Sequence, residues 1–253
     1  MILKRYHYAI ILSRGWEWRI LSNMDENLRL QVIARLRSDF TGKFGIPRQS
    51  NLVPEQEAVV VFEPAYRDKN ALRGLEGYSH LWLLWGFSEV VQEGWSPTVK
   101  PPKLGGNRRM GVFATRSPFR PNPIGLSSVK LVRLEKRAGL GTVLVVSGAD
   151  LMDGSHIYDV KPYLSFTDSH PDAKNGFAED HVNERLPVEF PPELLSRIPE
   201  EKRAALLASL SLDPRPGYLT GRSDPYGFGY AGKDVRFYVA DGVVKVFDVV
   251  EAP

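Results

Sequence analysis

The 253-residue sequence contains no cysteine. Disulfide bonds and thiolate metal sites are therefore excluded, and this composition is typical of a reducing compartment. The five histidines also lack the paired spacing that binds a metal ion. We expect no metal centre.

Long apolar runs are missing too. No stretch approaches the roughly 20 apolar residues that span a membrane, and the AIIL run at residues 9–12 is shorter than the roughly 7-residue core of a signal peptide. Apolar residues make up 43% of the chain and charged residues 25%, as in globular proteins. We expect a cytoplasmic protein that does not span a membrane.

Common catalytic signatures are absent as well. The sequence has no GxxxxGK[ST] phosphate loop, no GxGxxG pattern after a predicted strand and no GxSxG nucleophile turn. These absences argue against P-loop NTPases, Rossmann-type dinucleotide enzymes and α/β-hydrolases.

Positive charge is concentrated in one part of the chain. The net charge is only +3, but residues 97–137 hold ten basic residues and a single acid, Glu135. Such a cluster, which includes Arg108 and Arg109, suits a polyanion such as nucleic acid. A solvated face balanced by acids elsewhere in the fold explains the same residues equally well.

The pattern of apolar residues predicts a mainly β protein. Alternation predicts strands at residues 30–38, 57–64, 80–88 and 110–115, with a hairpin formed by residues 125–137 and 141–150. Pro- and Gly-rich loops join them without regular helical crossovers, which favours an antiparallel sheet or barrel over a doubly wound α/β fold.

Composition also suggests domain limits. Residues 1–25 are expected to form an N-terminal extension, residues 26–168 the β domain and residues 169–253 a small C-terminal α+β domain. The latter begins with a polar linker and has a helical region that Pro199 splits in two. It ends in a hairpin around Asp241-Gly242.

The loop ATRSPFRPNPIGLS, residues 114–127, combines stiffness with cations. Its prolines restrict the backbone, so Arg116, Arg120 and Asn122 could present donors to a ligand with little ordering cost. Alternatively, the prolines end a strand and the arginines cap carbonyl groups.

A second loop, DGSHIYDVKPY, groups acid and base side chains. Strand alternation would put Asp159, Lys161 and Tyr163 on one face, where a charge pair could shift a pKa. The plainer alternative is a solvent-exposed edge strand.

Several long motifs resemble the TsaA/YaeB family, now called TrmO. They are GKFGIPRQ, LRGLEGYSHLWLLWGF, PTVKPPKLGGNRRMGVFATRSPFRPNPIGLS, DLMDGSHIYDVKPYL and DPRPGYLTGRSDPYGFGYAGKDVRFYV. The resemblance covers about residues 30–250. It implies a single-sheet antiparallel β-barrel methyltransferase, dimeric, with S-adenosylmethionine held by loops at one barrel end. The family methylates N6 of N6-threonylcarbamoyladenosine at position 37 of tRNA, so the anticodon loop becomes the expected partner of the basic loops.

The resemblance also assigns residues. One departure is Ser155-His156, where the family often has Thr-Pro after Asp-Gly; losing the proline puts the contacts of that loop in doubt. The expected cofactor-binding residues are Pro47, Arg48, Gln49, His80, Arg116, Leu126, Asp153 and Gly154; the expected reacting end is Asp159, Lys161 and Tyr163; and the expected RNA contacts are Arg108, Arg109, Arg120 and Asn122.

The carbamoylated N6 is a poor nucleophile, so its proton must be removed. Asp159 or Tyr163 is the hypothesised base, with Lys161 lowering the pKa of that base or steadying the urea-like carbonyl. Two alternatives stay open: a non-catalytic RNA-binding barrel, and a methyltransferase for another nucleoside or a small molecule. The tail, with Arg215, Arg222 and Lys233, could grip the anticodon stem or pack as a lid.

Overall fold

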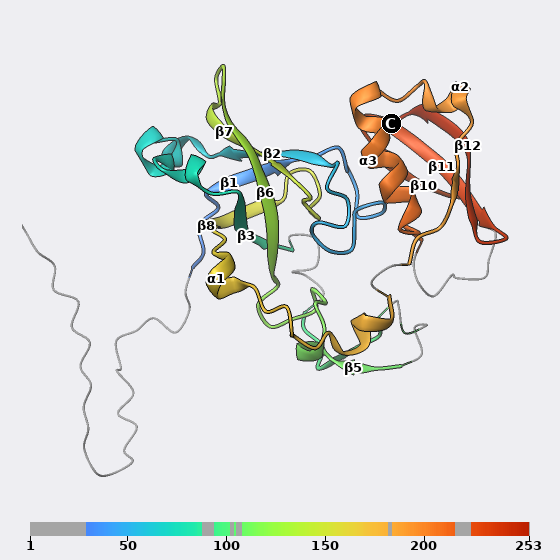
Figure 1. Ribbon diagram of the computed structural model, residues 1–253, viewed down its shortest axis with the longest axis horizontal. Helices are drawn as coiled ribbons and strands as arrows, with labels where there is room; N and C mark the ends of the chain where they lie inside the picture. The colour runs from blue at the N-terminus through green and yellow to red at the C-terminus, as the bar shows by residue number, and fades with distance from the viewer. Residues whose placement is uncertain are drawn as a thin grey trace, which may run out of the picture. The chain divides into compact units, whose positions relative to one another are not determined.

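A computed structural model describes residues 29–87, 94–101, 104, 108–181, 184–215 and 224–252. The expected extension at residues 1–25 and Arg222 lie outside these ranges. Residues 31–253 belong to one compact unit. The mainly β class and the antiparallel sheet are confirmed: two larger sheets and a two-stranded ribbon account for the strands (Figure 1).

The first sheet closes on itself in the order β1-β2-β7-β6-β3-β8, and every neighbouring pair is antiparallel. The long hairpin of β6 and β7 turns at residues 138–140, where Gly139 has a φ of 72°. The strands are β1 (Ala34–Arg37), β2 (Glu57–Phe62), β3 (His80–Gly86), β6 (Ile124–Arg137), β7 (Gly141–Ser147) and β8 (His156–Pro162).

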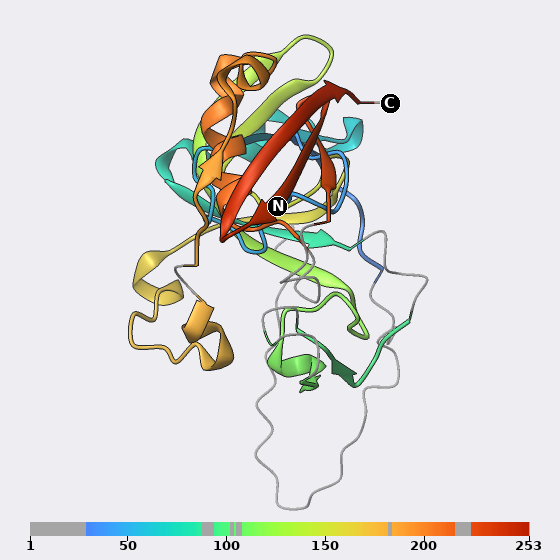
Figure 2. The same cartoon turned by 90° about the vertical axis from the view of Figure 1, so that its right-hand side faces the viewer.

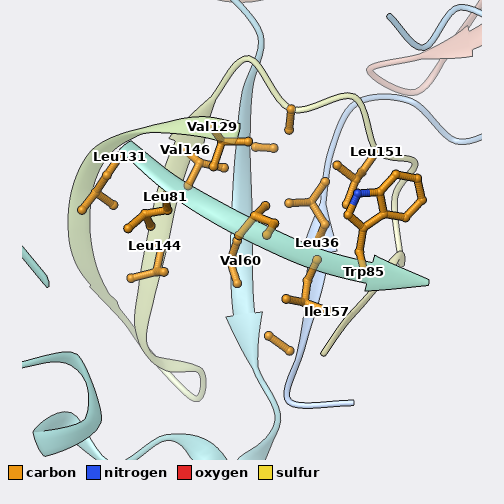
Figure 3. Packing of buried hydrophobic residues seen from close by; sticks show 14 of the residues in the cluster. Leu36, Val60, Leu81, Trp85, Val129, Leu131, Leu144, Val146, Leu151 and Ile157 are labelled. Carbon is orange, nitrogen blue, oxygen red and sulfur yellow. The ribbon is translucent and has the colours of Figure 1, made fainter. Parts of the chain in front are cut away.

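Alternate residues of these strands fill the inside of the closed sheet. Leu36, Val60, Leu81, Leu144 and Ile157 come from five different strands and point to a common centre (Figure 3). All five are 0% exposed. Because successive side chains on a strand point to opposite faces, the residues that precede and follow each of these five along its strand face outward.

The second sheet is covered by a helix. Its order is β10-β11-β12-β9, and helix α3 lies against it (Figures 1 and 2). Leu206 and Leu210 of helix α3 pack with Val235 and Val244 of the sheet. Helices α2 and α3 are separated at Pro199, as predicted. The elements are β9 (Val188–Glu189), α2 (Pro192–Leu195), α3 (Glu200–Ser211), β10 (Tyr226–Tyr230), β11 (Lys233–Ala240) and β12 (Val243–Glu251).

A largely buried polar network connects the two sheets. Phe40 pairs with Tyr230 in an isolated β-bridge. The Tyr230 hydroxyl donates to Gln56 Oε1 at 3.1 Å, and Asp39 accepts from Gln56 and from Lys202 Nζ, at 3.0 and 2.7 Å. Burial of its hydroxyl raises the pKa of Tyr230. The C-terminal segment is therefore tied to the barrel by matched donors and acceptors.

Some local predictions are wrong. The strand expected at residues 110–115 is only β5 (Met110–Gly111), paired with β4 (Thr98–Val99); it ends where η6 (Val112–Ala114) turns the chain. The strand expected at residues 30–38 is also shorter, because β1 spans only Ala34–Arg37. The remaining short helices are η1 (Pro64–Tyr66), η2 (Lys69–Leu72), η3 (Leu75–Gly77), α1 (Ser165–Asp168) and η7 (Gly176–His181).

The described residues include no helix that is long and apolar enough to cross a membrane. In the same residues, no group of three or more His, Asp and Glu side chains could hold a metal ion.

Candidate functional site

Three loops meet at one end of the barrel. Strands β1, β3 and β7 end at this edge, and β2, β6 and β8 begin there, because every neighbouring pair is antiparallel. The loops comprise residues 38–56, residues 148–155 and the stretch between β3 and β6, of which residues 87, 94–101, 104 and 108–123 are described. These three connecting segments contain the predicted residues Pro47, Arg48, Gln49, Arg108, Arg109, Arg116, Arg120, Asn122, Asp153 and Gly154.

Direct contacts hold these loops together. The Arg116 guanidinium donates to the side-chain oxygen of Gln49, which joins the first loop to the loop before β6. Asn51, in the first loop, contacts both the loop at residues 148–155 and strand β6. Its backbone N–H donates to the carbonyl of Gly148 at 2.8 Å, and its Nδ2 donates to the carbonyl of Ser128 at 3.0 Å. The geometry therefore unites Gln49 and Arg116 in one constellation.

Asp150 belongs to the same constellation, and the motif-based assignment missed it. The Ser127 hydroxyl donates to Asp150 Oδ1 at 2.5 Å and accepts from Trp85 Nε1 at 2.9 Å. Burial raises the pKa of Asp150, although the hydrogen bond from Ser127 and the nearby charge of Arg116 act in the opposite direction. The available signal was an acid three residues after the buried strand GTVLVVS, because a partly buried carboxyl needs partners.

We expect wild-type protein to lose stability relative to an Asp150→Asn variant as pH rises from 4 to 8. The pKa of the carboxyl is higher in the folded than in the unfolded chain, so its neutral form favours folding. The resulting stabilisation is complete below the ordinary pKa of 3.8 and disappears as pH rises through the folded-state pKa. Urea unfolding of both proteins across this pH range measures the difference.

Ser127→Ala provides the matched variant for this pH series. It removes a hydrogen bond that lowers the pKa of Asp150, so the loss of stability should move to higher pH. A stability difference between wild type and Asp150→Asn that does not change with pH would contradict the assignment.

Asp153 and Gly154 form a firmly held turn. The Asp153 carboxylate accepts from the backbone N–H of Ser38 at 3.1 Å and from Arg37 at 3.3 Å. Gly154 has a φ of 80°, and its N–H donates to the carbonyl of Leu36 at 2.8 Å. These bonds fix the turn without the proline that the family often has there.

The side chain of Arg48 is bonded away from Gln49 and Arg116, although its carbonyl accepts from Gln49 Nε2 at 2.5 Å. Its guanidinium donates to the carbonyls of Asp213 and Arg215, at 3.1 and 2.9 Å, and so binds the segment after helix α3. Arg215 is 6% exposed and makes two 2.8 Å hydrogen bonds to the Asp213 carboxylate. The expectation that Arg215 grips RNA is therefore wrong, because its charge is buried and paired. Lys233 is paired with Glu251.

The other predicted residues lie on the outer face of β6, β3 and β8. Leu84 is paired with Leu126 on one side and with Asp159 on the other, so these three side chains form one row. Leu126 is 56% exposed. Lys161 pairs with Asp159 at 2.9 Å, as the alternation predicted. The edge-strand alternative is wrong, since β8 lies between β1 and β3.

Tyr163 and His80 lie at the far end of this face. The Tyr163 ring contacts the rings of Trp82 and His80, with centroids 5.4 and 6.2 Å apart. Trp82 Nε1 donates to Asp168, whose pKa is lowered first by the N–H of Leu164 and then by Trp82. His80 is the first residue of β3, and the strand reaches the loop end of the barrel only at Gly86. His80 is therefore about 20 Å from that end along the strand. Within one chain, His80 and Gln49 do not share a pocket.

The basic residues near β5 divide into structural and exposed groups. Arg120 Nη1 donates to the carbonyls of Val112 and Thr115, at 3.0 and 2.8 Å, so the carbonyl-capping alternative is confirmed for Arg120. Arg109 is exposed and donates to Thr98 Oγ1 at 2.9 Å. Arg108 and Asn122 are exposed.

Comparisons with known proteins agree along most of the chain. Residues 35–169 match the family model described as the tRNA-methyltransferase O N-terminal domain. A tRNA (adenine(37)-N6)-methyltransferase of Escherichia coli K12 is 39% identical over 229 residues, covering 87% of this chain and 97% of that protein. A protein of the same name from Eikenella corrodens is 42% identical over 170 residues, covering 67% of this chain and 95% of that protein.

A solved structure gives the same result. The crystal structure of TrmO from P. aeruginosa superposes with a TM-score of 0.71 at 32% sequence identity, covering 93% of this chain and all of the solved chain. The similarity thus extends through both sheets. This chain belongs to the tRNA-methyltransferase O (TrmO) family.

Proposed function

We propose that this chain transfers a methyl group from S-adenosylmethionine to N6 of N6-threonylcarbamoyladenosine at position 37 of tRNA. The observation that carries the proposal is the 39% identity to the E. coli enzyme over 97% of its length. We propose specifically that the adenosine this chain methylates carries the threonylcarbamoyl group. The basic residues at the loop end supply the positive charge that binding of an anticodon loop requires.

The residues at the loop end fit the cofactor. S-adenosylmethionine supplies an electrophilic methyl group on a sulfonium and carries a carboxylate, an ammonium, a ribose and an adenine. The exposed Arg116 guanidinium suits a carboxylate, the Asp153 carboxylate suits a hydroxyl or ammonium group, and the exposed Leu126 suits an adenine ring. We propose that these residues, with Pro47, Gln49 and Gly154, hold it. Asp150 holds the start of β6 through its hydrogen bond with Ser127.

The protein's main catalytic task is placement. Holding N6 in line with the methyl carbon supplies roughly 7–11 kcal/mol of the barrier reduction. We propose Asp159 or Tyr163 as the acceptor of the N6 proton. The ion pair of Asp159 with Lys161 keeps the carboxylate beside a cation that could also steady the carbonyl of the modified base.

A homodimer accounts for the separation of these groups. Leu126 and Ile124, 56% and 38% exposed, give the outer face of β6 an apolar surface. We propose that a second copy packs there and brings its loop end toward His80, Asp159, Lys161 and Tyr163. We further propose residues 26–168 as the catalytic domain and residues 169–253 as a C-terminal domain, acting in the cytoplasm.

Incubation of the purified protein with S-adenosylmethionine and tRNA that carries the threonylcarbamoyl group tests the function. Mass spectrometry of the nucleosides should show a gain of one methyl group on that nucleoside. Titration calorimetry separates the alternatives: tRNA binding without cofactor binding supports a non-catalytic module. Cofactor binding without methylation of this nucleoside points to another acceptor.

A further inference from the structure

Phe113 is an exposed aromatic residue in an unusual setting. It is 72% exposed, whereas its neighbour Val112 is 1% exposed and anchors the same turn. The residue lies in η6, directly after β5 and three residues before Arg116. A phenylalanine with so little burial contributes little to the fold, so its ring is available to a ligand.

A fixed cation lies beside the ring. The Arg120 guanidinium carbon is 5.5 Å from the Phe113 ring centroid. That guanidinium cannot rotate freely, because its Nη1 donates to the carbonyls of Val112 and Thr115 on either side of Phe113. Cation and ring therefore form a preassembled pair, with the ring still largely open to solvent.

The backbone that carries the ring is rigid as well. Val112 N–H donates to the carbonyl of Pro97 at 3.0 Å, and Thr115 bonds back to the carbonyl of Val112 through both its N–H and its hydroxyl. Ser117 N–H donates in turn to Thr115 Oγ1 at 3.2 Å. A ring held this way loses little conformational entropy when it binds a ligand.

The surrounding charge selects the ligand class. Residues 94–134 contain no Asp or Glu, and Arg108, Arg109 and Arg116 are exposed near the ring in sequence. An exposed aromatic ring within a basic, acid-free segment is the combination that binds unpaired nucleotides, since bases stack on the ring and cations neutralise the phosphates.

We infer that the Phe113 ring, backed by Arg120, stacks an unpaired base of the tRNA anticodon loop that flanks the methylated adenosine. The inference rests on the proposed tRNA substrate and adds a nucleotide subsite to it. The base would lie on the ring face that Arg120 does not occupy, and so be carried by the same loop as Arg116.

The test compares Phe113→Ala, Phe113→Leu and Phe113→Trp with wild type, using a fluorescently labelled anticodon stem-loop RNA. We expect the alanine and leucine variants to bind RNA about tenfold more weakly or worse, since base stacking is sensitive to loss of the ring. The tryptophan variant should restore binding. Phe247→Ala, which removes an exposed ring from β12 of the other sheet, is the matched control and should bind normally.

Three outcomes would overturn the inference. RNA binding by Phe113→Leu as tight as that by Phe113→Trp would show that apolar contact alone matters. Weakened S-adenosylmethionine binding in Phe113→Ala would place the ring in the cofactor pocket. A changed oligomeric mass of Phe113→Ala would assign the ring to a protein interface. RNA affinity is measured without turnover. If wild type binds the RNA but does not methylate it, the proposed function is contradicted, while the effect of the Phe113 variants on RNA affinity can still be interpreted.

Discussion

Replacing Gly45 with alanine should lower the free energy of unfolding by about 2–4 kcal/mol. Gly45 has a φ of 85°, which costs a residue with a Cβ about 1 kcal/mol or more. Its Cβ would lie 2.3 Å from Phe228 Cδ2, and that ring is 5% exposed among Phe40 and Phe237. Overpacking such a core costs about 1–3 kcal/mol. Urea unfolding measures the sum.

Substitutions at two other glycines separate the backbone contribution from the packing contribution. Gly74 has the same φ of 85°, but no atom lies within 4 Å of the position that a Cβ would take there, so Gly74→Ala isolates the backbone effect. Gly42 has open space and no positive φ, so Gly42→Ala should change stability by less than about 0.5 kcal/mol. Equal losses in Gly45→Ala and Gly74→Ala would contradict the packing argument.

Gly45→Ala should also affect the candidate site. Gly45 lies two residues before Pro47, and its close approach to Phe228 docks the first loop on the C-terminal sheet. A shifted loop would move Gln49 away from Arg116. The variant should therefore lose methyl transfer even where it remains folded.

Local patterns predicted the elements whose signals are local. The hairpins β6–β7 and β11–β12 and the helix break at Pro199 all follow from alternation and turn residues. Strand β10 was missed because its turn to β11 uses Ala231, at a φ of 49°, followed by Gly232. Alanine gives no turn signal, unlike the Asp241 that marks the next turn.

Pairing between distant segments could not be predicted from the sequence. Alternation places Asp159 and Lys161 on one face of a strand, but it does not say that β8 lies between β1 and β3. The pairing of β3 with both β6 and β8 decides that Leu126 and Asp159 flank Leu84. Arg48 likewise donates to carbonyls after helix α3, more than 160 residues away, and no local motif contains that contact.

The candidate site also has a part that the sequence predicted and a part that it did not. Family motifs locate the loops that hold Gln49, Arg116 and Asp153, and the structure brings those loops to one end. The role of Asp150 depends on a contact with Ser127, 23 residues away on another strand. A single acid after an apolar strand resembles an ordinary strand end until that partner is known.

Replacing Arg116 with alanine should lower kcat/KM for tRNA methylation by about 100-fold. Hydrogen bonds to charged groups contribute about 1.5–3 kcal/mol, which corresponds to about 10- to 150-fold in an equilibrium constant. Arg116 is proposed to bind the cofactor carboxylate, and it also holds Gln49 in place. Titration calorimetry should show weaker S-adenosylmethionine binding, which distinguishes this effect from loss of RNA affinity alone.

Arg116→Lys should recover only part of the activity, because a lysine keeps the charge but lacks the fork that can serve Gln49 and a carboxylate together. Arg236→Ala is the matched control: Arg236 is an exposed arginine on β11 that pairs with Asp234 and Asp248. Its loss should leave cofactor affinity unchanged, since it lies on the other sheet. If Arg116→Ala binds S-adenosylmethionine within twofold of wild type, the cofactor carboxylate must be held by a group other than Arg116.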